Sequence, residues 1–172
     1  MEQLEQSKEQ DKNEKRPTFL VFLAVMSFIS IGFSFLGVFS SLFTGPLNEE
    51  QIEFQRAAMY DSISTFQSQG MDDVAAMFEK LMRYTEYMNS EAFYSGLISN
   101  LIVSVLGLIA VIMMLKLKKI GFHLYVGYSL LPIISMYIIT PMELISTFVV
   151  IVGLVISALF CLLYGLNLKH MK

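Results

Sequence analysis

The chain has 172 residues, of which 55% are hydrophobic and 16% are charged, and its mean hydropathy is +0.58. Soluble domains are nearer half apolar and about a quarter charged. The composition therefore excludes a secreted enzyme, a disordered linker and a nucleic-acid-binding protein, and it leaves an integral membrane protein. The single cysteine, Cys161, excludes an intrachain disulfide.

Residues 1–16 mix both charge signs with few aliphatic side chains, so we expect a disordered cytoplasmic tail. The apolar run at 17–44 is longer than a signal-peptide core and predicts transmembrane helix 1, an uncleaved anchor. Further apolar runs predict transmembrane helix 2 at 92–115, transmembrane helix 3 at 120–140 and transmembrane helix 4 at 141–166. A short cytoplasmic tail is expected at 167–172. Each run is long enough for the roughly 20 residues that span a bilayer. The expected fold class is all-α integral membrane.

Residues 45–91 predict an external amphipathic helical hairpin between spans 1 and 2. Asn48 and Gln51 fit a capping box for a helix over about 49–67, and Gly70 suits the left-handed position after its end. Apolar residues at helical spacing indicate a second helix, namely Val74, Met77, Phe78, Leu81, Tyr84 and Met88. No proline or glycine separates this helix from span 2, so the two can form one long helix, with a kink near Asn89-Ser90 as a further possibility.

The apolar side of this hairpin has three possible uses. It can cover the outer face of its own bundle, lie in the lipid headgroup layer or dock on a partner protein. Nine carboxylates against three basic residues in 45–91 disfavour anionic lipid. We expect Val74 and Leu81 to be covered by the chain itself, and Met77, Tyr84 and Met88 to form a partner-facing edge.

The basic residues set the expected orientation. Nine lysines and arginines lie in the N-terminal tail, in the loop between spans 2 and 3, and after span 4. With four spans, these three segments are all on the same side of the membrane. Cytoplasmic loops retain positive charge, so both termini are expected in the cytoplasm. Between spans 3 and 4, Thr140 and Glu143 fit a second capping box with Pro141 as the first helical residue, which predicts a tight hairpin.

Few polar side chains fall inside the spans. Asn100 lies about a third of the way into span 2, and an amide there needs a partner. We expect an interhelical hydrogen bond, the alternative being a polar group that lines a substrate path. Pro132 should kink span 3, with a gating hinge as the functional alternative.

No catalytic, cofactor or metal site is expected. His123, Cys161 and His170 all map to the cytoplasmic end, but their spacing matches no metal motif. Glu143 is explained by the capping box.

A basic loop precedes a Gly-Phe-x-Leu-Tyr sequence at the start of span 3, in the stretch Lys118-Lys119-Ile120-Gly121-Phe122-His123-Leu124-Tyr125-Val126. With the layout of tail, span, external helices and three tightly linked spans, it resembles uncharacterised small four-span bacterial inner-membrane proteins. The resemblance implies a multi-pass protein of the bacterial inner membrane and no particular activity.

These patterns favour a non-catalytic accessory or scaffold subunit of a bacterial inner-membrane complex. The expected partners are membrane lipids and other membrane proteins or a second copy of the chain, and not nucleic acid. The alternative is a small oligomeric transporter or channel that uses Asn100 and the Pro132 kink, and an enzyme ranks last. A polar face shared by spans 2 and 3 would favour the transporter, whereas a solid apolar core would favour the subunit.

The expected topology is testable by cysteine labelling in a Cys161→Ser background. An impermeant maleimide added to cells with an opened outer barrier should label Gly70→Cys and not Lys118→Cys, because position 118 belongs to the positively charged side. The reverse pattern would show that the orientation is wrong.

Overall fold

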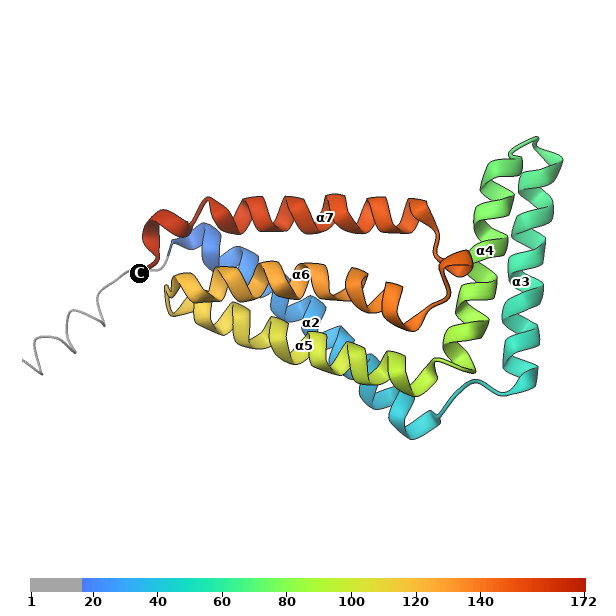
Figure 1. Cartoon of the computed structure of the whole chain (residues 1–172), viewed down its shortest axis with the longest axis horizontal. Helices are drawn as coiled ribbons and strands as arrows, with labels where there is room; N and C mark the ends of the chain where they lie inside the picture. The colour runs from blue at the N-terminus through green and yellow to red at the C-terminus, as the bar shows by residue number, and fades with distance from the viewer. Residues whose placement is uncertain (1–16) are drawn as a thin grey trace, which may run out of the picture.

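The computed structural model describes residues 17–172, and every regular element in this part of the chain is helical. The elements are α2 (Thr18–Thr44), α3 (Glu49–Ser68), α4 (Asp72–Asn89), α5 (Phe93–Leu115), α6 (Lys119–Ile139) and α7 (Thr147–Gly165), with short 3-10 turns at Met142–Leu144 and Leu168–His170. The predicted tail at 1–16 lies outside the described residues. Figure 1 shows α2, α5, α6 and α7 side by side, with α3 and α4 standing across one end. We call this the α4 end, and the opposite end, near Lys118, the lysine end.

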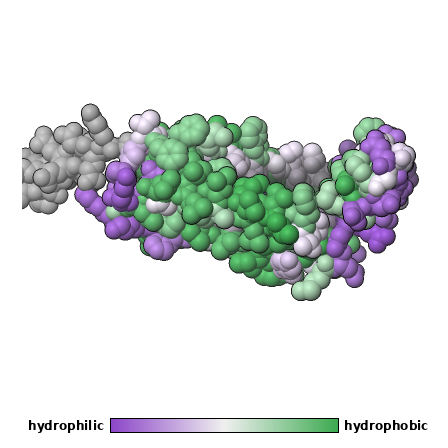
Figure 2. All heavy atoms as spheres, turned by 90° about the horizontal axis from the view of Figure 1, so that it is seen from above, coloured by the Kyte–Doolittle hydropathy of each residue, from purple (hydrophilic) through white to green (hydrophobic). Residues whose placement is uncertain are grey.

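The four lengthwise helices, within residues 17–172, are long and apolar enough to cross a membrane. Figure 2 shows an apolar belt over their length and polar residues towards the two ends. Helix α2 has 27 residues, or about 40 Å at 1.5 Å per residue. Because a bilayer core is about 30 Å thick, this helix has the length to cross at a slant, and it runs diagonally past the others in Figure 1.

Helices α5 and α6 are held together by glycines. A Cβ atom added to Gly121 would lie 2.6 Å from the backbone nitrogen of Met114, so the two backbones nearly touch there. At mid-span the ring of Tyr128 lies against Gly107, where an added Cβ would be 2.5 Å from the ring carbon Cε2. Small residues permit this close approach of helices in lipid.

The main apolar core lies at the lysine end. Its buried members come from α2, α5, α6, α7 and the adjoining turns: Leu20, Leu23, Ala24, Ile31, Ala110, Val111, Met114, Leu117, Tyr125, Tyr164 and Met171. Leu117 follows α5 with a left-handed φ of 57°, and its buried side chain explains a leucine where glycine is usual. The Lys119 N–H donates to the Lys172 carbonyl and the Lys172 N–H to the Leu117 carbonyl, at 2.9 and 2.7 Å. These bonds join the two chain segments at this end.

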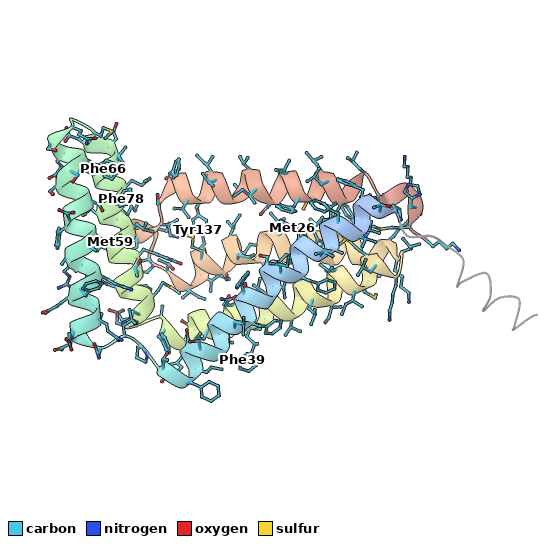
Figure 3. All side chains as sticks on the ribbon, turned by 180° about the vertical axis from the view of Figure 1, so that it is seen from behind. Met26, Phe39, Met59, Phe66, Phe78 and Tyr137 are labelled. Atoms are coloured by element: carbon cyan, nitrogen blue, oxygen red, sulfur yellow. The ribbon has the colours of Figure 1, made fainter. Side chains whose placement is uncertain are left out.

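Helices α3 and α4 form the expected antiparallel pair. The capping box at Asn48 and Gln51 is confirmed, with hydrogen bonds of 2.9 and 3.1 Å. Gly70 has the predicted left-handed backbone, φ 73°. Figure 3 shows Phe66 and Phe78 between the two helices, and their ring centroids are 5.1 Å apart.

Two polar side chains of α4 hold the α3–α4 pair in position, one within the pair and one on the bundle. The Asn89 amide accepts from the Leu47 N–H at 2.8 Å and donates to the Leu47 carbonyl at 3.3 Å, which ties the start of the pair to its end. The Tyr87 hydroxyl donates to the Ile139 carbonyl at 3.1 Å. Helix α4 is thereby held over the end of α6.

Two local expectations differ from the structure. Helices α4 and α5 are separate, because the chain turns at Ser90 (ψ −84°) and Ala92 is buried beside the turn. The Thr140 capping box is not formed: its hydroxyl points to the Met88 sulfur at 3.9 Å, and α7 begins at Thr147. Thr140 has the extended backbone that is favoured before a proline, here Pro141. Its hydroxyl contacts Met88 of α4 in place of the predicted capping bond.

The α5–α6 contact predicts opposite effects for two glycines of α6. Gly121→Ala should lower the free energy of unfolding by about 1–3 kcal/mol, since a methyl group there meets backbone. Gly127→Ala is the matched control, because an added Cβ has nothing within 4 Å, and helix propensity should make it neutral or slightly stabilising. Thermal unfolding in detergent measures both. Equal midpoints for the two variants would contradict the glycine contact.

The α3–α4 pair predicts that Phe78→Glu destabilises the isolated protein by about 2 kcal/mol, because it places a carboxylate against Phe66. Hydrogen exchange over residues 49–89 measures the effect. Phe54→Glu is the control, since Phe54 on α3 is 77% exposed. If Phe78→Glu spares the fold and instead abolishes co-purification with another protein, a partner covers this face.

Candidate functional site

A polar-lined cavity of about 200 Å³ lies between α5 and α6 and beneath α4. We call it the α4 cavity. It is lined by Tyr84, Met88, Gly96, Ser99, Asn100, Pro132, Ser135, Met136, Ile139 and Thr140. None of these side chains is charged. It brings together five residues that were singled out from the sequence: Asn100, Pro132, Tyr84, Met88 and Thr140.

Asn100 is the strongest hydrogen-bonding group of the α4 cavity. It is the eighth residue of α5, about 12 Å from the start of that helix. Its Oδ1 accepts a long bond of 3.4 Å from Ser104 on the same helix, and its Nδ2 has no partner among residues 17–172. The expected interhelical hydrogen bond is therefore replaced by a bond within α5, because Asn100 is exposed and lies on the wall of the open α4 cavity instead of against a neighbouring helix.

The side of the cavity next to α4 is formed by Tyr84 and Met88. Burial raises the pKa of the Tyr84 phenol, which keeps it a neutral hydrogen-bonding group. Met88 reaches into the space left by Gly96: a Cβ there would be 2.5 Å from the Met88 methyl carbon. The Thr140 hydroxyl lies 3.9 Å from the Met88 sulfur.

The three candidate partner-facing residues thus separate. Tyr84 and Met88 are half-buried and line a cavity of their own bundle, so this structure covers them in part without a partner. Met77 is also half-buried and lies about two helical turns further along α4, away from the cavity. A partner-facing role stays a prediction.

Pro132 lies on the wall of two cavities. Besides the α4 cavity, it lines a second cavity of about 290 Å³ among α2, α6 and α7, which we call the mid-span cavity. Proline has no N–H to donate and removes one hydrogen bond from the helix. The Ser135 hydroxyl donates to the Pro132 carbonyl at 2.9 Å. The expected weak point of span 3 therefore lies where the two cavities meet.

Within residues 17–172, the histidine, cysteine and acidic side chains form no cluster at either cavity. His123 is exposed, with Nδ1 3.0 Å from the Lys119 carbonyl, and Glu143 is exposed in the turn before α7. His170 is exposed and Cys161 is half-buried on α7. In the described part of the chain, no three His, Cys, Asp or Glu side chains are placed to hold a metal ion.

A group of three tyrosines in the lysine half of the bundle was not expected from the sequence. The ring centroids of Tyr125 and Tyr164 are 4.4 Å apart, and those of Tyr125 and Tyr128 are 5.4 Å apart. The Tyr164 hydroxyl and Ser27 Oγ are 2.8 Å apart, which links α7 to α2. The spacing of Tyr125 and Tyr128, three residues apart, was the available signal that both share one face of α6.

In comparisons with known proteins, no family model, curated sequence or solved structure matches the chain. The resemblance to small four-span inner-membrane proteins stays a prediction.

Proposed function

We propose that the protein is a small membrane transporter or channel for uncharged polar solutes, and that the α4 cavity receives the solute. The observation that carries this proposal is the Asn100 amide, whose Nδ2 has no hydrogen-bond partner within residues 17–172 and which lines a cavity between spans 2 and 3. An unsatisfied amide at this depth is costly in lipid, and a bound solute or water would satisfy it.

The chemistry of the lining supports a neutral solute. Asn100, Ser99, Ser135, Thr140 and Tyr84 offer amide and hydroxyl groups, which both donate and accept hydrogen bonds. A charged solute would have no countercharge among the lining side chains.

Passage would require a second conformation. The apolar core at the lysine end, with Met114, Tyr164 and Met171 buried, closes that end of the bundle in this structure. A bend of α6 at Pro132 is the simplest change that alters the cavity wall, since that helix lacks one backbone hydrogen bond there. We place the α4 end outside and both termini in the cytoplasm, in a bacterial inner membrane, on the distribution of basic residues.

A second candidate function is a non-catalytic accessory or scaffold subunit. Helix α7 favours it, because Tyr164 is its one buried residue and the rest of its surface is left to lipid or to a neighbour. An accessory subunit needs no solute site, so it does not require the Asn100 amide, whereas the transporter does.

The proposal predicts that proteoliposomes carrying the protein are permeable to glycerol. Asn100→Leu removes the amide at similar size and should lower the permeability about tenfold, the effect of losing roughly 1.4 kcal/mol of solute interaction. Stopped-flow light scattering measures the rate. Asn100→Cys, in a Cys161→Ser background, should also react with a water-soluble thiol reagent.

Ile102 provides the matched control, since it is 56% exposed on α5 and lines neither cavity. Ile102→Leu should keep the permeability, and Ile102→Cys should resist the reagent. Wild-type vesicles no more permeable than protein-free ones, or an Asn100→Leu variant equal to wild type, would count against transport of such solutes. Either result together with a constant co-purifying membrane protein would favour the accessory subunit.

A further inference from the structure

The mid-span cavity is a second site, distinct in chemistry and access from the α4 cavity. Its volume is about 290 Å³, and it lies among α2, α6 and α7. Tyr128 on its wall is the tenth of 21 residues in α6, and Ser30 is the thirteenth of 27 in α2. The cavity is therefore near the middle of the spans, with Tyr128 about 14 Å from one end of α6 and about 17 Å from the other.

Most of the hydroxyl groups around this cavity are already engaged. Ser157 donates to the Ser129 carbonyl at 3.0 Å, Ser129 donates to the Tyr125 carbonyl at 2.9 Å, and Ser27 pairs with Tyr164. Tyr128 and Ser30 line the cavity, and their hydroxyls have no hydrogen-bond partner among residues 17–172. Two donors are thus left in an apolar part of the molecule.

The walls that α2 and α7 give to the cavity are partly exposed. These two helices are close at the lysine end and separate towards the α4 end (Figure 1), and Figure 3 shows Met26 on α2. Met26 and Ile156 on the cavity wall are 46% and 51% exposed. A molecule would enter this site from the hydrocarbon of the membrane.

We propose that the mid-span cavity binds an uncharged, lipid-soluble ring compound that carries carbonyl oxygens, of the quinone class. Its carbonyl oxygens would accept hydrogen bonds from Tyr128 and Ser30, which an acyl chain cannot do. Tyr125, Tyr128 and Phe160 supply aromatic rings against which a flat ring packs. An apolar cavity of about 150 Å³ holds benzene, so the observed volume has room for a substituted ring. Phospholipid headgroups and esters lie at the interface, far from this depth.

The test is photolabelling of the full-length protein in nanodiscs with an azido-substituted quinone, in the presence and absence of excess decylubiquinone. Competable label should be found on peptides of α6 and α7. Tyr128→Phe and Ser30→Ala should each reduce it about fivefold, the expected effect of one lost hydrogen bond. Tyr137→Phe is the matched control, because Tyr137 is on α6, is 45% exposed and lines neither cavity.

Ser30→Ala keeps the test valid if Tyr128→Phe disturbs folding, since Ser30 is exposed and makes no hydrogen bond. Circular dichroism and gel filtration report on the fold of each variant. Label that both variants retain at the wild-type level would overturn the proposal. Competition by decylcyclohexane equal to that by the quinone would also overturn it and assign the cavity to acyl chains. The Asn100 variants, by contrast, should label as wild type does, which separates this site from the proposed solute site.

Discussion

The close contact between α5 and α6 is the constraint on which the rest of the bundle depends. Lipid is as apolar as the helix surfaces, so helices associate in it through fitted packing and interhelical hydrogen bonds. Gly121 brings α6 onto the backbone of α5 near Met114, and Gly107 receives the ring of Tyr128. With Tyr128 fixed in this way, Tyr125 contacts Tyr164, whose hydroxyl pairs with Ser27. The interior of the lysine half thus follows from two glycines.

The α4 half of the bundle is hollow because the side chains that face one another there are small or polar. Towards that end α5 presents Ser99 and Asn100 and α6 presents Pro132 and Ser135, none of which provides the apolar bulk that fills the lysine end. The space is covered by α4, which is held over the end of α6 by the hydrogen bond from the Tyr87 hydroxyl to the Ile139 carbonyl. Helix α4 therefore lies over its own bundle, and the face of α3 that carries Phe54 is left exposed.

Local signals in the sequence were enough for most of the helices and for some of their ends. The Asn48 capping box and the left-handed Gly70 depend on neighbouring residues only, and both are present. The Thr140 pattern is equally local, but the contact of Thr140 with Met88, from a helix 52 residues earlier, replaced it. The partner of Asn100 and both cavities depend on which helix faces meet, and periodicity alone does not contain that information. Asn100 and Pro132 are unusual inside a span and indicated the α4 cavity from the sequence. The serines and tyrosines of the mid-span cavity are ordinary residues of a membrane helix, so none of them alone indicated that cavity.

The two cavities differ in a way that follows from the exposure of their walls. The α4 cavity lies under the charged helix α4 and has an amide at its side, which suits the polar solute proposed for it. The mid-span cavity has hydroxyls and aromatic rings between apolar helices, which suits the lipid-soluble ring compound proposed for it. Pro132 is common to both walls, at the one position of α6 where the backbone cannot donate a hydrogen bond. A change in the bend of α6 would alter both volumes together, and by linkage an occupant that favours one bend must shift the affinity of the other site.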